Sequence, residues 1–511
     1  MASSPERQVQ KTPKEIFRDN LKFLFIAGGG LFGDGYLNTT IGLVVPMIGF
    51  IYFQDKKGSV PALQGSEMKG TFSIGMIVGQ LLFGTLGDTL GRHRVYGKEC
   101  LFTIFGTLLV VLLPWHGLSQ TGVVAWMSVF RFVTGIGPGG DYPMTSTLSA
   151  EHQIFGSRAR LVLLAFSFIA LGQLTASIVL IVLLAAFKGD IQRDVTRFEW
   201  VWRLLFGLGI IPLTATVYAR FTIKETKPYQ KYVANETSVT NINKRGISEQ
   251  FRDFKEYFSE WRHARVLMAT ALSWFLFDVA FYGISLNQSI VLASIGFGHG
   301  KTPYDSMWKT AVGNIIATMA GSLPGVYIGV FLPDLIGRRN LQFYSALTSS
   351  VLYAIWAGVQ TTASTGGLMT LFALSQLVLG AGPNITTFLL PVELYPTRVR
   401  GTAHGISAAS GKCGAVLTAF AFGTAADKIG VRGVIGLFSG VMALVALITL
   451  LIPEPKGRTL EDIENDVMYG KSIDSVANSV EDSPISREST AKIVGKPEDE
   501  GYGATVEART A

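Results

Sequence analysis

The sequence contains twelve stretches of more than 20 mostly apolar residues, separated by shorter polar segments. A helix needs about 20 such residues to cross the hydrocarbon core of a bilayer. Only 16% of the residues are charged, whereas soluble domains carry roughly 25%. The sequence therefore predicts an all-α membrane protein with twelve transmembrane helices. The predicted spans are residues 22–46, 68–89, 95–116, 122–148, 161–187, 202–222, 266–293, 306–332, 341–361, 366–392, 402–426 and 431–452.

The longest polar segment between two spans separates the sixth from the seventh and divides the spans into two sets of six. This arrangement favours a duplicated architecture, and an internal repeat supports it. Polar residues rich in Ser, Glu, Asp and Lys follow the last span and predict a largely disordered tail. The expected parts are a cytoplasmic N-terminal tail (1–21), an N-terminal six-helix half (22–222), a cytoplasmic linker (223–265), a C-terminal six-helix half (266–452) and a cytoplasmic tail (453–511).

The internal repeat is an Asp-x-x-Gly-Arg sequence that follows the second span of each half. A short acidic-Gly-basic turn is common, but its recurrence at equivalent loops argues against chance. The residues are Gly84, Asp88, Gly91 and Arg92 in the first copy, and Asp334, Gly337 and Arg338 in the second.

Several ionisable residues fall inside the predicted spans. Asp34 and Asp278 lie at the midpoints of spans one and seven, Lys412 lies in span eleven, and Arg131 and Asp141 share span four. A charged group at the centre of a membrane helix costs about 2.5–3.5 kcal/mol on insertion scales, so such residues face a cavity or each other. They therefore predict a functional site, and the alternative is a set of structural ion pairs.

Span seven carries a polar stripe. Trp274, Asp278 and Tyr282 follow each other at four-residue spacing, so they share one helical face. Packing alone could explain the two aromatic residues but hardly the carboxylate. The face offers an indole N–H, a carboxylate and a phenol to a polar ligand.

Composition and motifs exclude several other classes. The net charge of +7 comes with basic residues in tails and loops, without a basic domain, so we expect a lipid bilayer rather than nucleic acid as the partner. The six histidines show no metal-ligand spacing, and no nucleotide loop or catalytic triad is present. The sequence therefore predicts neither an enzyme nor a cofactor, and it indicates no obligate protein partner.

These residues resemble the major facilitator superfamily. The paired loops are similar to its Gly-x-x-x-Asp-x-x-Gly-Arg motif, with Val330 in place of the second leading glycine, and RFVTGIGPGGDYP (131–143) resembles its fourth-helix motif. GGDYP (139–143), SWFLFDVAFYGISLNQS (273–289) and ELYPTRVRGTAHGISAASGKCGA (393–415) resemble the proton-coupled phosphate symporters of fungi and plants. The resemblance implies two six-helix halves around a central site.

It also implies roles for individual residues. In such symporters the face of Trp274, Asp278 and Tyr282 binds the anion, and the remaining contact positions match Tyr142, Asn384 and Lys412. The lysine would compensate the charge of the anion, and a protonated Asp278 would donate a hydrogen bond to the anion. Asp34 and Asp141 are candidates for the proton route, with Glu99 and Arg131 as groups that tune them. The two repeated loops would control conformational gating.

The resemblance fails at two positions. Leu37 stands where phosphate symporters carry a second acid, and Ile169 stands where they carry a glutamine, while Asp-Gly-Tyr-x-Asn (34–38) resembles the related glycerophosphoinositol and glycerophosphocholine permeases. A more apolar site suits a phosphodiester better than phosphate. We therefore expect a proton-coupled symporter that imports a phosphate-bearing anion, with glycerophosphodiesters preferred and inorganic phosphate as the alternative.

An alternative of another class is a non-transporting nutrient sensor with the same fold. It would need a long structured C-terminal extension, which the polar tail does not predict. The excess of Lys and Arg on the tails and the linker favours both termini in the cytoplasm, and the resemblance implies the plasma membrane.

Overall fold

The computed structural model describes residues 13–152, 157–234, 246–298 and 300–469, and within them the protein is helical without a strand. The first half contains α1 (Pro13–Tyr52), η1 (Gln54–Lys56), α2 (Ala62–Leu90), α3 (Arg92–Val95), α4 (Lys98–Val111), α5 (Gln120–Glu151), α6 (Arg158–Phe166), α7 (Phe168–Ala186), α8 (Lys188–Arg193), η2 (Val195–Arg197), α9 (Phe198–Leu208) and α10 (Ile210–Phe221). The linker contains α11 (Lys227–Tyr229), the π-helix η3 (Gln230–Ala234) and α13 (Ile247–Ser259).

The second half continues with the same kind of long helices. It contains α14 (Trp261–Ser285), α15 (Gln288–Ile295), α16 (Pro303–Ala317), the π-helix η4 (Thr318–Ser322), α17 (Leu323–Ile336), α18 (Arg338–Val359), α19 (Thr365–Ala381), α20 (Pro383–Leu394) and α21 (Arg400–Thr449). The helix α22 (Leu460–Tyr469) belongs to a separate unit that begins at Arg458. Most of the expected disordered tail lies outside the described residues.

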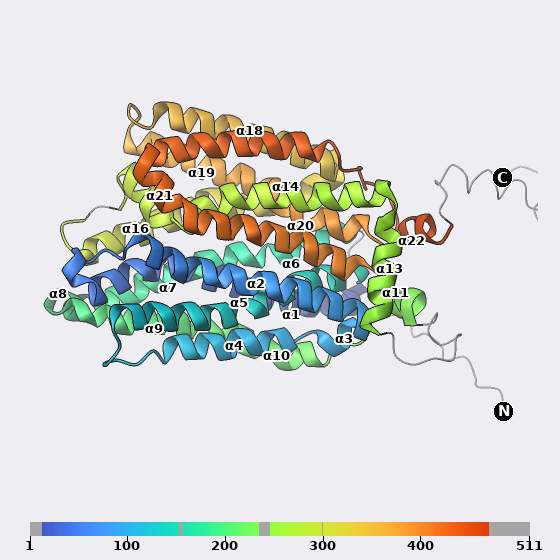
Figure 1. Ribbon diagram of the computed structural model, residues 1–511, viewed down its shortest axis with the longest axis horizontal. Coiled ribbons are helices and arrows are strands. Elements are labelled where there is room, and N and C mark those ends of the chain that lie inside the picture. Colours follow the sequence, from blue (N-terminus) through green and yellow to red (C-terminus); the bar gives the residue numbers. More distant parts are fainter. Residues whose placement is uncertain (1–12, 153–156, 235–245, 299, 470–511) are drawn as a thin grey trace, which may run out of the picture. The chain divides into compact units, whose positions relative to one another are not determined.

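The long helices lie side by side in a bundle (Figure 1), and α13, α11 and α3 lie at one end, opposite α8. We call these the linker end and the far end. Each of the twelve predicted spans coincides with a long helix or with consecutive helices. By length and composition, eight helical segments of the described chain could each cross a membrane. The prediction of an all-α membrane protein is therefore confirmed, while the exact bounds of the two halves remain a prediction.

Several spans are interrupted. The two predicted spans after residue 402 form the single helix α21, in which Gly430 takes the non-helical angles φ 71° and ψ 163°. The eighth span contains η4, and π-turns of this kind occur frequently at functional sites. Gly430 is exposed and lies at the turn between the two predicted spans, whereas η4 lies within a span, where neighbouring helices can satisfy its backbone.

Small residues allow close helix approach. A Cβ added at Gly75 or Gly79 of α2 would collide with the carbonyl oxygens of Phe132 and Ile136 on α5. At Gly84 the added atom would lie 2.6 Å from the Gly401 carbonyl oxygen on α21. The glycines therefore allow α2 to pack closely against α5 of its own half and against α21 of the other half, as small residues do in other membrane bundles.

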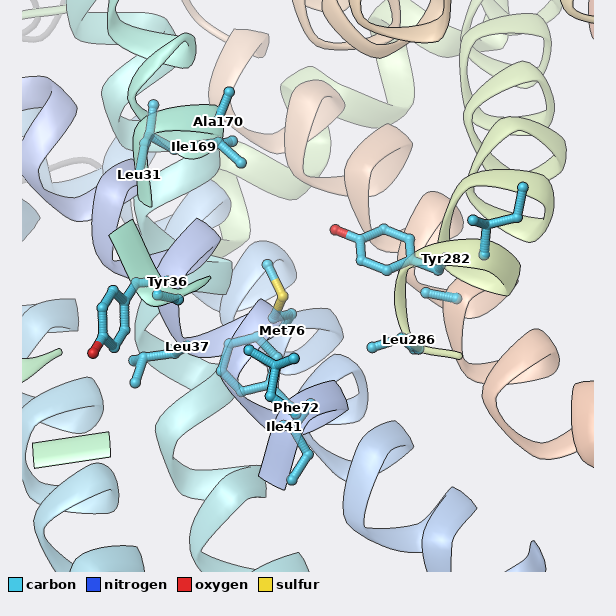
Figure 2. Packing of buried hydrophobic residues seen from close by; sticks show 14 of the residues in the cluster. Leu31, Tyr36, Leu37, Ile41, Phe72, Met76, Ile169, Ala170, Tyr282 and Leu286 are labelled. Carbon is cyan, nitrogen blue, oxygen red and sulfur yellow. The ribbon is translucent and has the colours of Figure 1, made fainter. Parts of the chain in front are cut away.

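The apolar core extends through both halves. Figure 2 shows Leu31, Tyr36, Leu37 and Ile41 of α1, with Ile169 of α7 and Tyr282 of α14. Leu37 lies beside Tyr36 and apart from the Tyr282 hydroxyl, and only 1% of Leu37 is exposed. The position where phosphate symporters carry a second acid is thus core packing in this protein.

Candidate functional site

A buried ion pair forms the centre of the site. The Lys412 ammonium on α21 donates to Asp278 Oδ2 at 3.1 Å and to the Tyr282 hydroxyl at 2.8 Å, both on α14. Lys412 and Asp278 are each 1% exposed. The four-residue spacing on span seven therefore places Asp278 and Tyr282 on the same cation.

The N-terminal half contributes the opposite wall. The Tyr142 hydroxyl on α5 donates to Asp34 Oδ2 on α1 at 2.9 Å, and the Tyr142 ring lies 5.3 Å from the Lys412 nitrogen. Asp34 Oδ1 is buried and has no hydrogen-bond partner among the described residues. Two aspartates, one from each half, thus lie on either side of one lysine and two tyrosines.

Aromatic side chains enclose this charged centre. Trp274 lies 6.5 Å from Tyr142 and 6.4 Å from Phe388, measured between ring centroids. A Cβ added at Gly411 would lie 2.5 Å from the Trp274 ring, so α21 approaches the indole closely. The ion pair beside these rings is buried, and such a low-dielectric surrounding strengthens the electrostatic interactions within it.

Asn384 lies on a neighbouring cavity. This small cavity is lined by Asn384, Ile169, Gln173, Gln376 and other residues of both halves. Gln173 follows Ile169 by one helical turn and so lies on the same face of α7. Gln173 therefore supplies, one turn later, the amide that Ile169 lacks. The sequence analysis considered only the position of Ile169 and missed Gln173.

A second buried charge cluster involves Asp141. The Arg220 guanidinium on α10 donates to Asp141 Oδ1 at 2.6 Å and to Glu99 Oε1 at 3.2 Å. All three side chains are nearly or fully buried. Arg220 holds together α4, α5 and α10, and the sequence analysis did not single it out.

Arg131 lies elsewhere in the bundle. Its Nε donates to the Met68 carbonyl oxygen at 2.9 Å, and its guanidinium lies between the Phe72 and Phe206 rings at 4.8 and 5.7 Å. Its other two nitrogens have no hydrogen-bond partner among the described residues. The structure therefore brings Arg220, and not Arg131, to Glu99 and Asp141.

The first repeated loop joins the two halves at the linker end. The Asp88 carboxylate accepts hydrogen bonds from the Gly401 and Thr402 backbone nitrogens at 3.1 and 2.7 Å, at the start of α21. Arg92 pairs with Asp88 at 3.1 Å and donates to the Thr397 carbonyl oxygen at 2.9 Å. A carboxylate at a helix N-terminus is favoured by the free N–H groups and the helix dipole.

The second loop mirrors this arrangement. Asp334 accepts from the Ser157 hydroxyl at 3.0 Å and from Arg160 at 2.9 Å, at the start of α6. Arg338 pairs with Asp334 at 3.3 Å and with Glu393 at 2.7 Å. Each half therefore supplies an aspartate to a helix start in the other half.

The glycines of the two loops also correspond. Gly91 and Gly337 adopt φ values of 97° and 91°, and Glu225 and Glu454 respectively lie against them. Glu454 accepts from the Arg338 backbone nitrogen at 2.9 Å, and Glu225 accepts from that of His93 at 3.4 Å. These two glutamates extend the internal repeat, although the sequence motif does not include them.

Comparison with known proteins agrees with this architecture. Residues 22–467 match the family model described as sugar (and other) transporter. The inorganic phosphate transporter PHO84 of Saccharomyces cerevisiae is 35% identical over 507 residues, which cover 89% of this chain and 85% of that protein. The repressible high-affinity phosphate permease of Neurospora crassa is 31% identical over 496 residues, with 88% and 86% covered.

A solved structure shows the same fold. The proton:xylose symporter XylE, a member of the major facilitator superfamily from Escherichia coli, matches with a TM-score of 0.65 at 18% identity, over 89% of this chain and 99% of that one. The likeness concerns the fold, because the identity is low. From the family match and these relatives, the chain belongs to the sugar (and other) transporter family, a family of integral membrane transporters and not of enzymes, and it has the fold of the major facilitator superfamily.

Proposed function

We propose that this protein imports inorganic phosphate together with protons across the plasma membrane, with its linker end in the cytoplasm. The observation that carries the proposal is the Lys412–Asp278 pair, buried between aromatic rings at the meeting point of the two halves. The names of the relatives, an inorganic phosphate transporter and a phosphate permease, support phosphate as the anion.

The expected preference for glycerophosphodiesters gains no support, and the alternative of inorganic phosphate fits better. That preference was based on Leu37 and Ile169. Leu37 is core packing, and Gln173 provides an amide one turn after Ile169 on the cavity of Asn384. The apolar identity of these two positions therefore does not make the whole cavity apolar.

The ion pair suggests how the proton and the anion are coupled. Without substrate, Asp278 neutralises the Lys412 charge across 3.1 Å. An anion on Lys412 would be repelled by an ionised Asp278, whereas a protonated Asp278 would donate a hydrogen bond to it. Each ligand therefore binds more tightly when the other is bound, and this reciprocity is a property of linked equilibria.

Asp34 extends the coupling to the N-terminal half. It shares a hydrogen bond with Tyr142, whose ring contacts the lysine, so a proton on Asp34 would change the charge facing the same site. Asp141 and Glu99, with Arg220, would form the next group on the proton route. The Asp88 and Asp334 contacts would break when the linker end opens, which gives the repeated loops their gating role.

Uptake experiments test this proposal. In cells that lack their own phosphate and glycerophosphodiester carriers, the wild type should take up radiolabelled phosphate, faster at lower external pH, and a protonophore should abolish the uptake. Asp34→Asn should lose accumulation because an amide cannot cycle a proton, while Asp427→Asn, an exposed position, serves as control. Strong competition by glycerophosphocholine with weak competition by phosphate would instead favour glycerophosphodiesters as the substrate.

A further inference from the structure

A second lysine connects the two halves at the far end. Lys69 lies seven residues after α2 begins, about 10 Å along the helix axis at 1.5 Å per residue. Its ammonium donates to Asn287 Oδ1 at 3.0 Å, and the residue is partly buried. Among the described residues, no carboxylate lies within ion-pair distance of it.

Asn287 is fixed for this contact. It lies between α14 and α15, and its Nδ2 donates to the Gly283 carbonyl oxygen at 3.1 Å, which leaves its oxygen for the lysine. Two residues later, the Ser289 hydroxyl donates to the Gly42 carbonyl oxygen on α1 at 3.0 Å. Two hydrogen bonds therefore connect the halves at the far end in this conformation.

A polar cavity begins beside this contact. Ser285 and Gln288, two residues before and one residue after Asn287 in sequence, line a second small cavity together with Gln173 and Gln376. Both glutamines also line the cavity of Asn384. Polar side chains thus extend from the neighbourhood of Asn287 towards the middle of the bundle.

An ammonium held by one neutral amide is incompletely compensated. Removing a charge from water is costly unless it is paired, and an amide oxygen supplies only a partial charge. An oxyanion carries a full negative charge, so it would bind the same ammonium more strongly than a neutral amide oxygen does. Lys69 is therefore better suited to exchange its partner than to remain on Asn287.

We propose that Lys69 is an anion-capture site at the far end, where an incoming phosphate replaces the Asn287 amide on the ammonium as the halves separate. The phosphate then moves between the separated halves, past Gln173 and Gln376, to Lys412. The identity of the anion and the outward direction of the far end rest on the proposed function. When the substrate binds Lys69, the Lys69–Asn287 hydrogen bond that helps to close the far end is therefore lost.

Three variants distinguish capture from simple closure. Lys69→Gln should raise the KM of phosphate uptake at least about tenfold, because a charge-assisted hydrogen bond is lost, and Lys69→Arg should stay near the wild type. Asn287→Leu breaks the same contact but leaves the cation free, so its KM should be unchanged or lower. If Lys69 only closes the far end, Lys69→Gln and Asn287→Leu will shift KM in the same direction, which would overturn the proposal.

A second measurement does not depend on transport. In a Cys413→Ser background, which removes the exposed native thiol, Asn287→Cys should react faster with a negatively charged methanethiosulfonate than with a positively charged one. Adding Lys69→Gln should remove this preference. The same preference for the negative reagent with and without Lys69 would overturn the proposed capture site. Absence of phosphate uptake in cells that express the wild-type protein would overturn only the proposed function.

Discussion

The Lys412 ammonium and the Asp278 carboxylate lie 3.1 Å apart on α21 and α14, and each side chain is 98% shielded from solvent. A pair in such a place gains Coulomb energy but loses hydration, so its net contribution to stability is small. Removing one partner is costly, since the other remains buried and unpaired. A role in binding an anion therefore explains this buried pair better than a role in stabilising the fold does.

Lys412→Ala should abolish phosphate uptake, because no other cation of the described chain contacts Asp278 and Tyr282. Uptake should be measured per molecule at the cell surface. Lys428→Ala is the matched control, since Lys428 is exposed on the same helix, and it should transport normally. Near-normal uptake by Lys412→Ala would exclude the lysine as the anion-binding group.

A paired variant separates stability from binding. Lys412→Ala should lower the unfolding free energy by about 3–5 kcal/mol, because it leaves Asp278 buried and unpaired. Lys412→Met combined with Asp278→Leu should recover most of this loss, as apolar replacements of buried pairs often do, yet remain inactive. Recovery of transport in the double variant would contradict the proposed site.

Arg220→Ala should destabilise the protein by about 3–5 kcal/mol, because Asp141 and Glu99 would share a buried site without a cation. Thermal unfolding in detergent measures the loss. Arg193→Ala removes an exposed arginine of α8 and should change stability by no more than about 0.5 kcal/mol. Equal melting temperatures for the two variants would show that Arg220 does not compensate the carboxylates.

Gly91→Ala and Gly337→Ala should each cost about 1–2 kcal/mol, because their φ values of 97° and 91° are unfavourable for a residue with a Cβ. Contact with Glu225 and Glu454 adds to this cost. Gly207→Ala in α9 meets open space and should leave stability unchanged or slightly higher. Similar melting temperatures for all three would contradict the strained geometry of the repeated loops.

His152 predicts a pH dependence of stability at the linker end. It follows α5, stacks on Phe23 at 4.2 Å between ring centroids, and burial lowers its pKa below the ordinary value. The unfolded chain therefore binds the proton more tightly, so stability is lost as pH falls through about 6.5, the unfolded pKa. His152→Phe keeps the stacking, and its melting temperature should fall less between pH 7.5 and pH 5 than that of the wild type. An identical fall would assign the acid sensitivity to other groups.

Hydropathy and helical spacing were sufficient to predict much of this protein. The twelve spans follow from composition along the chain, and Asp278 and Tyr282 share a face because they are four residues apart. The repeated loops could also be found from their own residues. All of these signals are local. They predict the structure well because a membrane span must form its backbone hydrogen bonds within its own helix.

What remained hidden depends on contacts between distant segments. Arg220 lies 79 residues from Asp141, and nothing in its own span marks it as the partner in place of Arg131. The one-turn shift from Ile169 to Gln173 became visible only when both were placed on the cavity of Asn384. Glu225 and Glu454 repeat each other in space, but their neighbouring sequences, IKETKP (223–228) and IPEPKG (452–457), share only the pattern Ile-x-Glu-x-Lys.

Uptake into proteoliposomes is the measurement that tests the central claim most directly. Purified protein in vesicles with an imposed inward proton gradient should accumulate radiolabelled phosphate above its external concentration, and Lys412→Ala vesicles should remain at background. Dissipating the gradient should release the accumulated label. No accumulation by the wild type, or accumulation that is independent of the proton gradient, would contradict proton-coupled phosphate transport by this protein.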